Sequence, residues 1–348
     1  MKLTYNCSIP NTFGLPVHAA CLLEYDSAAE LRALLLDARF SAELPLPLLH
    51  IGSGSNLLFT GDFPGTVLHS RIGGVEVMPF RDEKEAVVRV GSGVVWDQFC
   101  LWAAQQGFWG PENLSSIPGE VGAAAVQNIG AYGREVKDIV ESVECLDLST
   151  KAMVTIPGSA CGYGYRESRF KGELKGRYVV IAVQFRLRKD EWTELDYGHV
   201  REALITRYGG DIGLSPLQVR EVIVDIRAGK LPSPTEIGSA GSFFRNPFIL
   251  PEQYARIAAI AEKENLGPVP HFANEDGTIK VPAAWLIEKC GWKGHREGNA
   301  GVYEKQPLVL INATGRATPD EIVSLKDKII DSVRTRFGVL LRPEVEII

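Results

Sequence analysis

The sequence predicts an α+β protein of two or three domains. Its 348 residues exceed the roughly 250–300 residues at which a single hydrophobic core usually stops growing. Strand-like runs from about residue 67 to 94 and from 139 to 187 follow one another with few helices between them, which favours antiparallel pairing. A hydrophobic content of 45% and a charged content of 23% are typical of a globular protein.

The net charge, the cysteines and the histidines limit which partners, compartments and metal ions we expect for this protein. A net charge of −6 gives no general attraction to nucleic acid or anionic membranes, so we expect neither as a partner. The N-terminus carries no basic stretch followed by an apolar core, and no apolar run approaches 18 residues. The six cysteines are scattered without a CxxC pair, which predicts reduced thiols and a cytoplasmic protein. The six histidines form no cluster, so we expect no metal.

Helix and strand signals alternate in the first third of the chain. Ser27 and Glu30 form a capping box that begins a helix over residues 31–39. A short buried strand over 46–51 follows and ends in GSGSNLL, and the next segment, TGDFPGTV, is turn-like. The run VVWDQFCLWAAQQ predicts a helix that stops at Gly107.

The middle and the end of the chain differ in pattern. Residues 110–138 are glycine-rich and weakly periodic, and a structureless loop of this length inside a domain is usually functional. After residue 215 a helix leads into a proline-punctuated linker, and helix–strand alternation then predicts a separate C-terminal domain. The final helix starts at Thr318 with a second capping box and stops at Gly338.

Two segments of small residues are candidates for anion binding. GSGSN, residues 52–56, lacks the lysine of a P-loop and the third glycine of a Rossmann fingerprint. Its backbone N–H groups can still form an anion nest, although this segment taken alone favours a flexible turn. The second segment carries Gly119, Gly122, Gly130 and Gly133, which allow either close approach of a large flat ligand or close packing. Together the two segments favour a dinucleotide.

The stretch GSAGSFFRNP, residues 238–247, places a single hydroxyl, Ser242, between a glycine and two phenylalanines. Taken alone, these residues favour a tight bend that enters a buried strand, with the hydroxyl capping a backbone group.

Several motifs then occur together and in a fixed order: NTFG, GSGSNLLF, IPGEVGAAAVQNIGAYG, YRESRFK, GSAGSFFRNP, AAWLIEKCGWKG, QPLVLIN and RPEVEI. In this combination the chain resembles the UDP-N-acetylenolpyruvoylglucosamine reductase (MurB) family over nearly its whole length. Tyr197, followed by Gly198, is similar to the tyrosine loop of one of the two subtypes of the family, type I.

The resemblance implies a vanillyl-alcohol-oxidase/PCMH-type FAD-binding fold in two subdomains, plus a smaller α/β substrate-binding domain. We expect the subdomains at 1–73 and 74–225, with an FAD-binding region at about 20–190. The substrate domain is expected at 226–348, with a terminal strand near 341–348 that can return to the active site.

The same resemblance implies the chemistry. FAD would take a hydride from NADPH and pass it from N5 to C3 of the enolpyruvyl group, and Ser242 would give a proton to C2. Arg166 would meet the developing negative charge, since its fork suits a carboxylate. Glu344 would have to be protonated beside that charge, so that it could donate a hydrogen bond or polarise Ser242.

The remaining site residues are also expectations from the resemblance. Those expected to bind the cofactor are Gly52, Ser53, Gly54, Ser55, Asn56, Leu57, Ser116, Ile117, Pro118, Gly119, Gly122, Ala123, Asn128, Gly130, Ala131, Tyr132 and Gly133. Those expected to bind the nucleotide-sugar are Tyr197, Lys230, Asn246 and Gln306. We expect a monomer.

Two other functions remain alternatives. The first is another FAD-dependent oxidoreductase of the same superfamily, although oxidation of an alcohol needs a base rather than the proton donor that Ser242 would supply. The second is a non-catalytic nucleotide-sugar binding module, which would be colourless and would not bind FAD.

Overall fold

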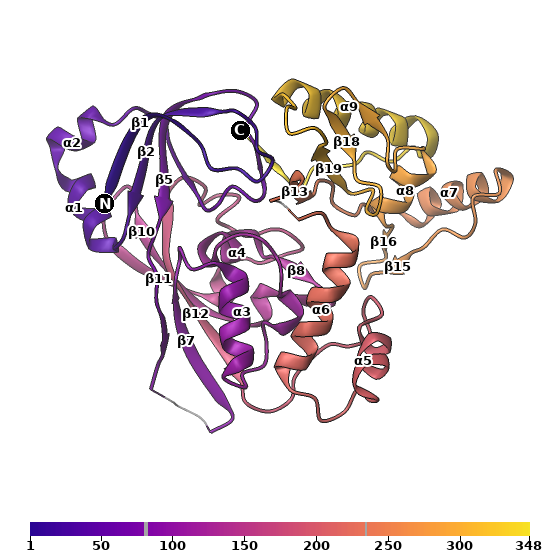
Figure 1. The fold of residues 1–348 in the computed structure, drawn as a ribbon, viewed down its shortest axis with the longest axis horizontal. Coiled ribbons are helices and arrows are strands. Elements are labelled where there is room, and N and C mark those ends of the chain that lie inside the picture. Colours follow the sequence, from indigo (N-terminus) through magenta and orange to yellow (C-terminus); the bar gives the residue numbers. More distant parts are fainter. Residues whose placement is uncertain (80–82, 234) are drawn as a thin grey trace. The chain divides into compact units, whose positions relative to one another are not determined.

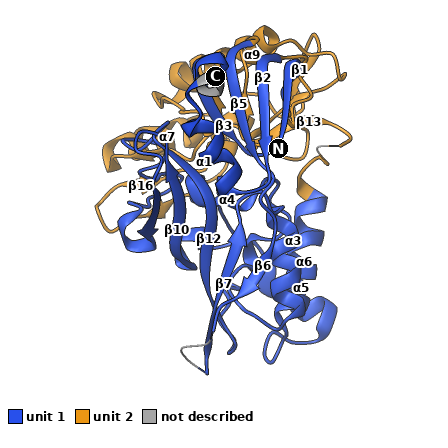
Figure 2. Cartoon of the chain, turned by 90° about the vertical axis from the view of Figure 1, so that its left-hand side faces the viewer, with its two compact units in different colours: residues 1–9, 18–53, 63–229 blue, residues 10–17, 54–62, 230–348 orange. Residues whose placement is uncertain are grey.

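The computed structural model describes residues 1–79, 83–233 and 235–348 (Figure 1). The chain divides into two compact units, shown in different colours in Figure 2. Unit 1 comprises residues 1–9, 18–53 and 63–229, and unit 2 comprises residues 10–17, 54–62 and 230–348. Two short segments near the N-terminus therefore belong to the unit that contains the C-terminus.

Unit 1 begins with a four-stranded sheet in the order β1-β2-β5-β3. Its strands are β1 (Lys2–Ser8), β2 (His18–Tyr25), β3 (Leu48–Ile51) and β5 (Phe63–Ser70). β2 and β3 both pair with β5 in parallel, and the crossover between them holds α1 (Ala28–Leu36) and α2 (Ala38–Glu43). Ser27 caps α1 as predicted, with its hydroxyl accepting the Glu30 N–H. The TGDFPGTV segment is not purely turn-like, because β5 already starts at Phe63.

The second sheet of unit 1 is entirely antiparallel, with the order β11-β10-β12-β7-β6. Its strands are β6 (Val75–Val77), β7 (Glu85–Gly91), β10 (Val140–Asp147), β11 (Met153–Pro157) and β12 (Tyr178–Arg188). The predicted helix at 94–106 is α3 (Trp96–Gln105), and it packs its aromatic face on this sheet. The Phe99 ring stacks on Phe185 of β12 with ring centroids 4.8 Å apart. The described α+β organisation agrees with the predicted fold class.

Two more helices of unit 1, α5 (Val200–Tyr208) and α6 (Pro216–Lys230), come after the antiparallel sheet in the sequence. They bury Leu204, Val219 and Ile223 around Trp109, and α6 lies between α3 and α5 in Figure 1. The α6 helix runs through the expected boundary at residue 226, and Pro234 of the expected linker lies outside the described residues. The three-domain division stays a prediction.

The prediction of a structureless loop over residues 110–138 is wrong. This segment holds η1 (Glu112–Leu114), α4 (Val121–Gln127), the hairpin β8 (Gly130–Ala131) and β9 (Arg134–Glu135), and η2 (Val136–Asp138). α4 carries little periodic signal because it is short and rich in alanine. Contacts distant in sequence fix it instead: the N–H groups of Val121 and Gly122 donate to the carbonyls of Val94 and Ser92.

Unit 2 contains a four-stranded antiparallel sheet in the order β13-β19-β18-β17. Its strands are β13 (Gly238–Ser242), β17 (Arg296–Glu297), β18 (Ala300–Val302) and β19 (Val309–Asn312). A small sheet of β14 (Phe248–Ile249), β16 (Ile279–Lys280) and β15 (Phe272–Ala273) lies in the same unit, as does the parallel pair β4 (Leu57–Leu58) and β20 (Glu346–Ile347).

Three helices complete unit 2: α7 (Pro251–Lys263), α8 (Ala283–Lys289) and α9 (Pro319–Phe337). The predicted ends of the last helix are confirmed. Thr318 and Glu321 form the capping box, and Gly338 ends α9 with a φ of +68°. Within the described ranges, none of the helices has the length and apolar content needed to cross a bilayer.

Candidate active site

Ser242 lies at the end of β13, where the strand is irregular. The register of β13 against β19 shifts between Ser239 and Ser242, and Gly241 between them has a φ of +69°. This backbone conformation favours glycine. The two residues that follow, Phe243 and Phe244, are buried. The expected tight bend is therefore present, and buried aromatic rings hold the chain immediately after the hydroxyl.

Glu344 lies on a segment that is hydrogen-bonded to this bend. Its N–H donates to the carbonyl of Phe243 at 2.7 Å. On its other side Asn56 Nδ2 donates to the Glu344 carbonyl at 3.3 Å, and the Glu346 N–H donates to the Asn56 carbonyl at 3.0 Å. Unit 2 thus brings together three expected site segments, those of Ser242, Glu344 and Asn56, which are far apart in the sequence.

Gly54 shows why the GSGSN segment contains glycine. Its φ is +71°, and a Cβ added there would lie 2.2 Å from the carbonyl oxygen of Pro10. The Gly54 carbonyl accepts the Thr12 N–H at 3.3 Å, and Thr12 Oγ1 donates to the Ser239 carbonyl at 2.6 Å. The NTFG motif therefore supports both the GSGSN segment and the strand that carries Ser242.

Several glycines of the second small-residue segment are explained by packing within the protein. A Cβ at Gly122 would lie 2.9 Å from the Cβ of Ser92. At Gly130 it would lie 2.5 Å from Nη1 of Arg166. The sequence left open whether these glycines allow close approach of a ligand or close packing within the protein. At Gly122 and Gly130 close packing requires glycine.

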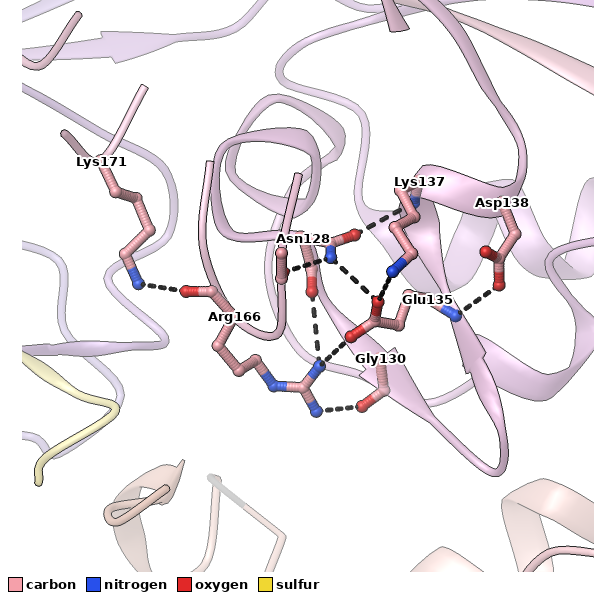
Figure 3. Close-up of polar contacts among 8 residues, drawn as sticks. Asn128, Gly130, Glu135, Lys137, Asp138, Arg166 and Lys171 are labelled. Atoms are coloured by element: carbon pink, nitrogen blue, oxygen red, sulfur yellow. Dashed lines mark hydrogen bonds and ion pairs between the residues drawn. The ribbon is translucent and has the colours of Figure 1, made fainter. Parts of the chain in front are cut away.

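Arg166 is held against the segment that precedes β9 (Figure 3). Its Nη1 donates to the Asn128 carbonyl at 3.3 Å, and its Nη2 donates to the Gly130 carbonyl. Glu135 Oε1 lies 3.9 Å from Nη1, so a carboxylate partly balances the guanidinium charge. The Arg166 side chain is only 17% exposed, and its φ is +58°. Arg166 is therefore a partly buried arginine fixed to expected cofactor-binding residues, rather than half of an exposed surface ion pair.

Ser116 is held by residues that the sequence did not single out. Its φ of +60° is unusual for a residue other than glycine. The Ser116 N–H donates to Asp97 of α3, and its carbonyl accepts Nε of Arg227 at 3.3 Å. Asp97 also pairs with Arg220 through contacts of 2.6 and 2.8 Å.

The electrostatics of this cluster follow from burial and pairing. Burial acts to raise the pKa of Asp97, but the hydrogen bonds from Arg220 and Ser116 outweigh it and hold that pKa below its usual value. Burial lowers the pKa of Arg227. Arg220 and Arg227 are two turns apart on one face of α6, and this spacing is the sequence signal that could have found them.

Glu120 is a further residue beside the expected cofactor segments that the sequence did not single out. It is buried, and its Oε1 lies 2.9 Å from Nε2 of the buried His69 on β5. Its other oxygen, Oε2, would be 3.1 Å from a Cβ at Gly52. A buried carboxylate–imidazole pair therefore supports the start of the GSGSN segment.

The four expected nucleotide-sugar residues have different surroundings. Tyr197 is 47% exposed and meets the Tyr132 ring edge to face, with centroids 6.5 Å apart. Lys230 is the exposed last residue of α6. Asn246 Oδ1 accepts the N–H of Ala283 at the start of α8, and Gln306 Oε1 accepts the N–H of Leu308.

Family models match both parts of the chain. Residues 19–155 match the model described as "FAD binding domain". Residues 233–348 match the model described as "UDP-N-acetylenolpyruvoylglucosamine reductase, C-terminal domain".

Individual relatives extend these matches to the full length. A UDP-N-acetylenolpyruvoylglucosamine reductase of Bacteroides fragilis is 47% identical over 348 residues and covers 100% of both chains. That of Chromobacterium violaceum is 42% identical over 335 residues, covering 96% of this chain and 95% of the other. The crystal structure of UDP-N-acetylenolpyruvylglucosamine reductase from Thermus caldophilus has the same fold, with a TM-score of 0.65, 22% identity and coverage of 97% and 95%.

Proposed function

Because this chain belongs to the UDP-N-acetylenolpyruvoylglucosamine reductase family, we propose that Ser242, Arg166 and Glu344 carry out its reaction. The chain is an FAD-dependent oxidoreductase that uses NADPH. It reduces the enolpyruvyl group of its UDP-sugar to give UDP-N-acetylmuramate, a precursor of peptidoglycan. The assignment of individual residues to steps is the proposal.

The residues present fit an FAD. We place the cofactor on segments 52–57, 116–123 and 128–133, which hold every expected cofactor residue. The support is that Gly54 and Ser116 adopt left-handed backbone and are each fixed by hydrogen bonds from other segments. When bound, FAD would supply the hydride chemistry that connects NADPH to C3 of the enolpyruvyl group.

Ser242 supplies the proton that completes the reduction. Hydride addition at C3 leaves negative charge on C2 and on the substrate carboxylate, and such a carbanion is basic enough to take a proton from a hydroxyl. The observation that carries this role is the hydrogen bond between Phe243 and Glu344, which joins the two expected catalytic segments next to the hydroxyl. Glu344 then polarises the Ser242 hydroxyl or donates a hydrogen bond to the charge.

Arg166 provides fixed positive charge near the expected cofactor segment. Hydrogen bonds to the carbonyls of Asn128 and Gly130 hold its guanidinium before the reaction, so little reorganisation is needed when negative charge develops. Lys171 Nζ donates to the Arg166 carbonyl at 3.2 Å and supports the left-handed backbone of that residue (Figure 3).

We assign the chain to the type I subtype on the Tyr197 loop, and we assign nucleotide-sugar contacts to Lys230, Asn246 and Gln306. We further propose a cytoplasmic monomer without nucleic-acid or membrane partners. The free cysteines of the described residues agree with a reducing compartment.

Ser242→Ala tests the central assignment by separating the half-reactions. In anaerobic stopped flow, NADPH should reduce the bound flavin at the parent rate. Reoxidation by the enolpyruvyl nucleotide-sugar should slow by about 10²–10⁴-fold, as expected for loss of a general acid. Ser242→Cys should recover part of this rate, because a thiol can still deliver a proton.

Ser239→Ala, a serine in the same strand, is the matched control and should leave both half-reactions unchanged. Slower flavin reduction with normal reoxidation in Ser242→Ala would make the serine a nicotinamide contact instead. If Ser242→Ala leaves both half-reactions unchanged, Ser242 has no catalytic role and residues 238–247 form only a tight bend.

A further inference from the structure

Asn113 joins two segments that are far from it in the sequence. It lies in η1 and is 0% exposed. Its Nδ2 donates to the carbonyl of Tyr132 at 2.8 Å and to the carbonyl of Glu194 at 2.6 Å. Its Oδ1 accepts the hydroxyl of Thr193 at 3.0 Å. The Asn113 side-chain amide therefore bridges two segments. It is hydrogen-bonded to Tyr132 in residues 130–133 and to Thr193 and Glu194 in residues 192–198.

The segment 192–198 has little secondary structure to define its position. It connects β12, which ends at Arg188, to α5, which starts at Val200, and its residues before the last turn lie in neither helix nor strand. Backbone bonding ties its end to α5 through the Leu195 carbonyl and the Arg201 N–H. Its place on the 130–133 segment depends on side-chain contacts.

Those contacts are close and all lie within unit 1. A Cβ at Gly133 would lie 2.5 Å from Cγ of Glu194, and a Cβ at Gly198 would lie 3.2 Å from the Tyr132 ring. The guanidinium of Arg134 lies 3.9 Å from the centroid of the Trp192 ring. The segment that carries Tyr197 thus rests on the residues that precede and begin β9.

The two segments differ in how much else holds them. Residues 130–133 are also fixed by Arg166 at the Gly130 carbonyl and by the β8–β9 hairpin. The carbonyl of Glu194 has Asn113 as its donor. Leu195 stays anchored in the apolar cluster around Trp109, so loss of the Asn113 amide should loosen the residues of 192–198 on either side of it and leave residues 130–133 in place.

We propose that Asn113 is a positioning residue for the nucleotide-sugar: it fixes the Tyr197 segment on the 130–133 segment before substrate arrives. The proposal rests on the substrate-binding role assigned to Tyr197 above. Asparagine is required because the position needs two N–H donors and one acceptor on a planar group. An ionised aspartate has no donor, and leucine has no donor and no acceptor.

Asn113→Asp and Asn113→Ala test this role. Flavin should be retained at the parent stoichiometry, and NADPH should reduce it within about twofold of the parent rate. The KM for the enolpyruvyl nucleotide-sugar should rise by about 10–100-fold, the effect of losing one or two buried hydrogen bonds, with a smaller change in kcat. Hydrogen exchange should quicken in residues 192–198 but not in β12. Asn265→Asp, which adds the same charge outside unit 1, should change none of these quantities.

A double mutant with Tyr197→Ala separates the possible failures. If Asn113 acts through Tyr197, Asn113→Ala adds little to the KM increase caused by Tyr197→Ala alone. Additive increases in KM, loss of flavin, or faster exchange with an unchanged KM would each overturn the positioning role. An unchanged KM in Tyr197→Ala alone would instead refute the role assigned to Tyr197, and with it the basis of the proposal.

If neither Asn113 variant folds, Thr193→Val tests whether Asn113 positions the Tyr197 segment. It removes the hydroxyl that donates to Asn113 Oδ1 and that also hydrogen-bonds the Glu112 side chain, and it should raise KM by about 2–5-fold while flavin reduction stays normal. Equal KM values in parent and Thr193→Val would contradict the proposal in that case.

Discussion

At the scale of single residues, Glu112 is a titratable group that the proposed chemistry does not use. Burial raises the pKa of Glu112 to about 7, although the Gly110 N–H donates to its Oε2 and favours the charged form. In an unfolded chain a glutamate has a pKa near its ordinary value of 4.5. Between these two values the folded protein holds a proton that the unfolded chain has released.

The stability of the protein should therefore fall as pH rises from about 4.5 to 7. The unfolded state binds fewer protons in this interval, so the free energy of unfolding decreases, by up to about 3 kcal/mol from this one group. Glu112→Gln, which keeps an acceptor for the Gly110 N–H, should remove this dependence. Denaturant unfolding at pH 5 and pH 8 measures it.

The test is the difference in the free energy of unfolding between Glu112→Gln and the parent, measured at each of the two pH values. The variant should match the parent at pH 5 and exceed it at pH 8. A constant difference between the two proteins across this range would mean that Glu112 is ionised in the folded state at both pH values.

At the scale of elements, α3 and α6 hold the Ser116 turn through charges rather than through apolar packing alone. Arg220 is 7% exposed, and its guanidinium is balanced by both carboxylate oxygens of Asp97. Removing one member of such a pair leaves a buried charge without compensation.

Asp97→Asn should lower the free energy of unfolding by about 2–4 kcal/mol and weaken FAD binding, because the Ser116 N–H also loses its charged acceptor. Thermal unfolding and flavin stoichiometry check these two effects. The double variant Asp97→Leu/Arg220→Met removes both charges and should recover most of the stability but not the flavin affinity. Equal losses of stability in the single and double variants would exclude the charge-pair explanation.

The elements also show what the sequence could predict. Helices α3 and α9 were predicted nearly to their ends, because their caps and apolar periodicity are local signals. The short helix α4 was missed because its position depends on the backbone of Ser92 and Val94. In the candidate site, motif order indicated Ser242, Arg166 and Glu344. Asp97 and Asn113 were missed because their partners are 19 to 123 residues away, and no local pattern reports such contacts.

At the scale of the whole molecule, unit 2 is not a continuous stretch of sequence. Residues 10–17 and 54–62 complete it, although the matching C-terminal family model starts at residue 233. Phe13 is 0% exposed and meets the Phe243 ring edge to face, and its carbonyl accepts Asn312 Nδ2. A Cβ at Gly238 would lie 2.1 Å from that same carbonyl oxygen.

The isolated fragment 230–348 should therefore not unfold cooperatively. Without the two N-terminal segments, the Phe243 ring loses a neighbour, and Asn312 and the edge of β13 lose hydrogen-bond partners. Circular dichroism during heating should show a broad, shallow change. Adding a synthetic peptide of residues 8–19 should sharpen it, whereas a sharp transition for the fragment alone would show that it is a self-sufficient domain.

The Asn56–Glu344 hydrogen bond has a consequence for how the protein is made. Its two residues are 288 positions apart, so Asn56 leaves the ribosome long before its partner is synthesised. At about 5–20 residues per second, the wait is roughly 15–60 s. During that interval β4 has no β20 to pair with, and the hydrophobic residues Leu57 and Leu58 are open to other contacts. The nascent chain thus carries a strand without its partner for most of its translation, until residues 346 and 347 are synthesised.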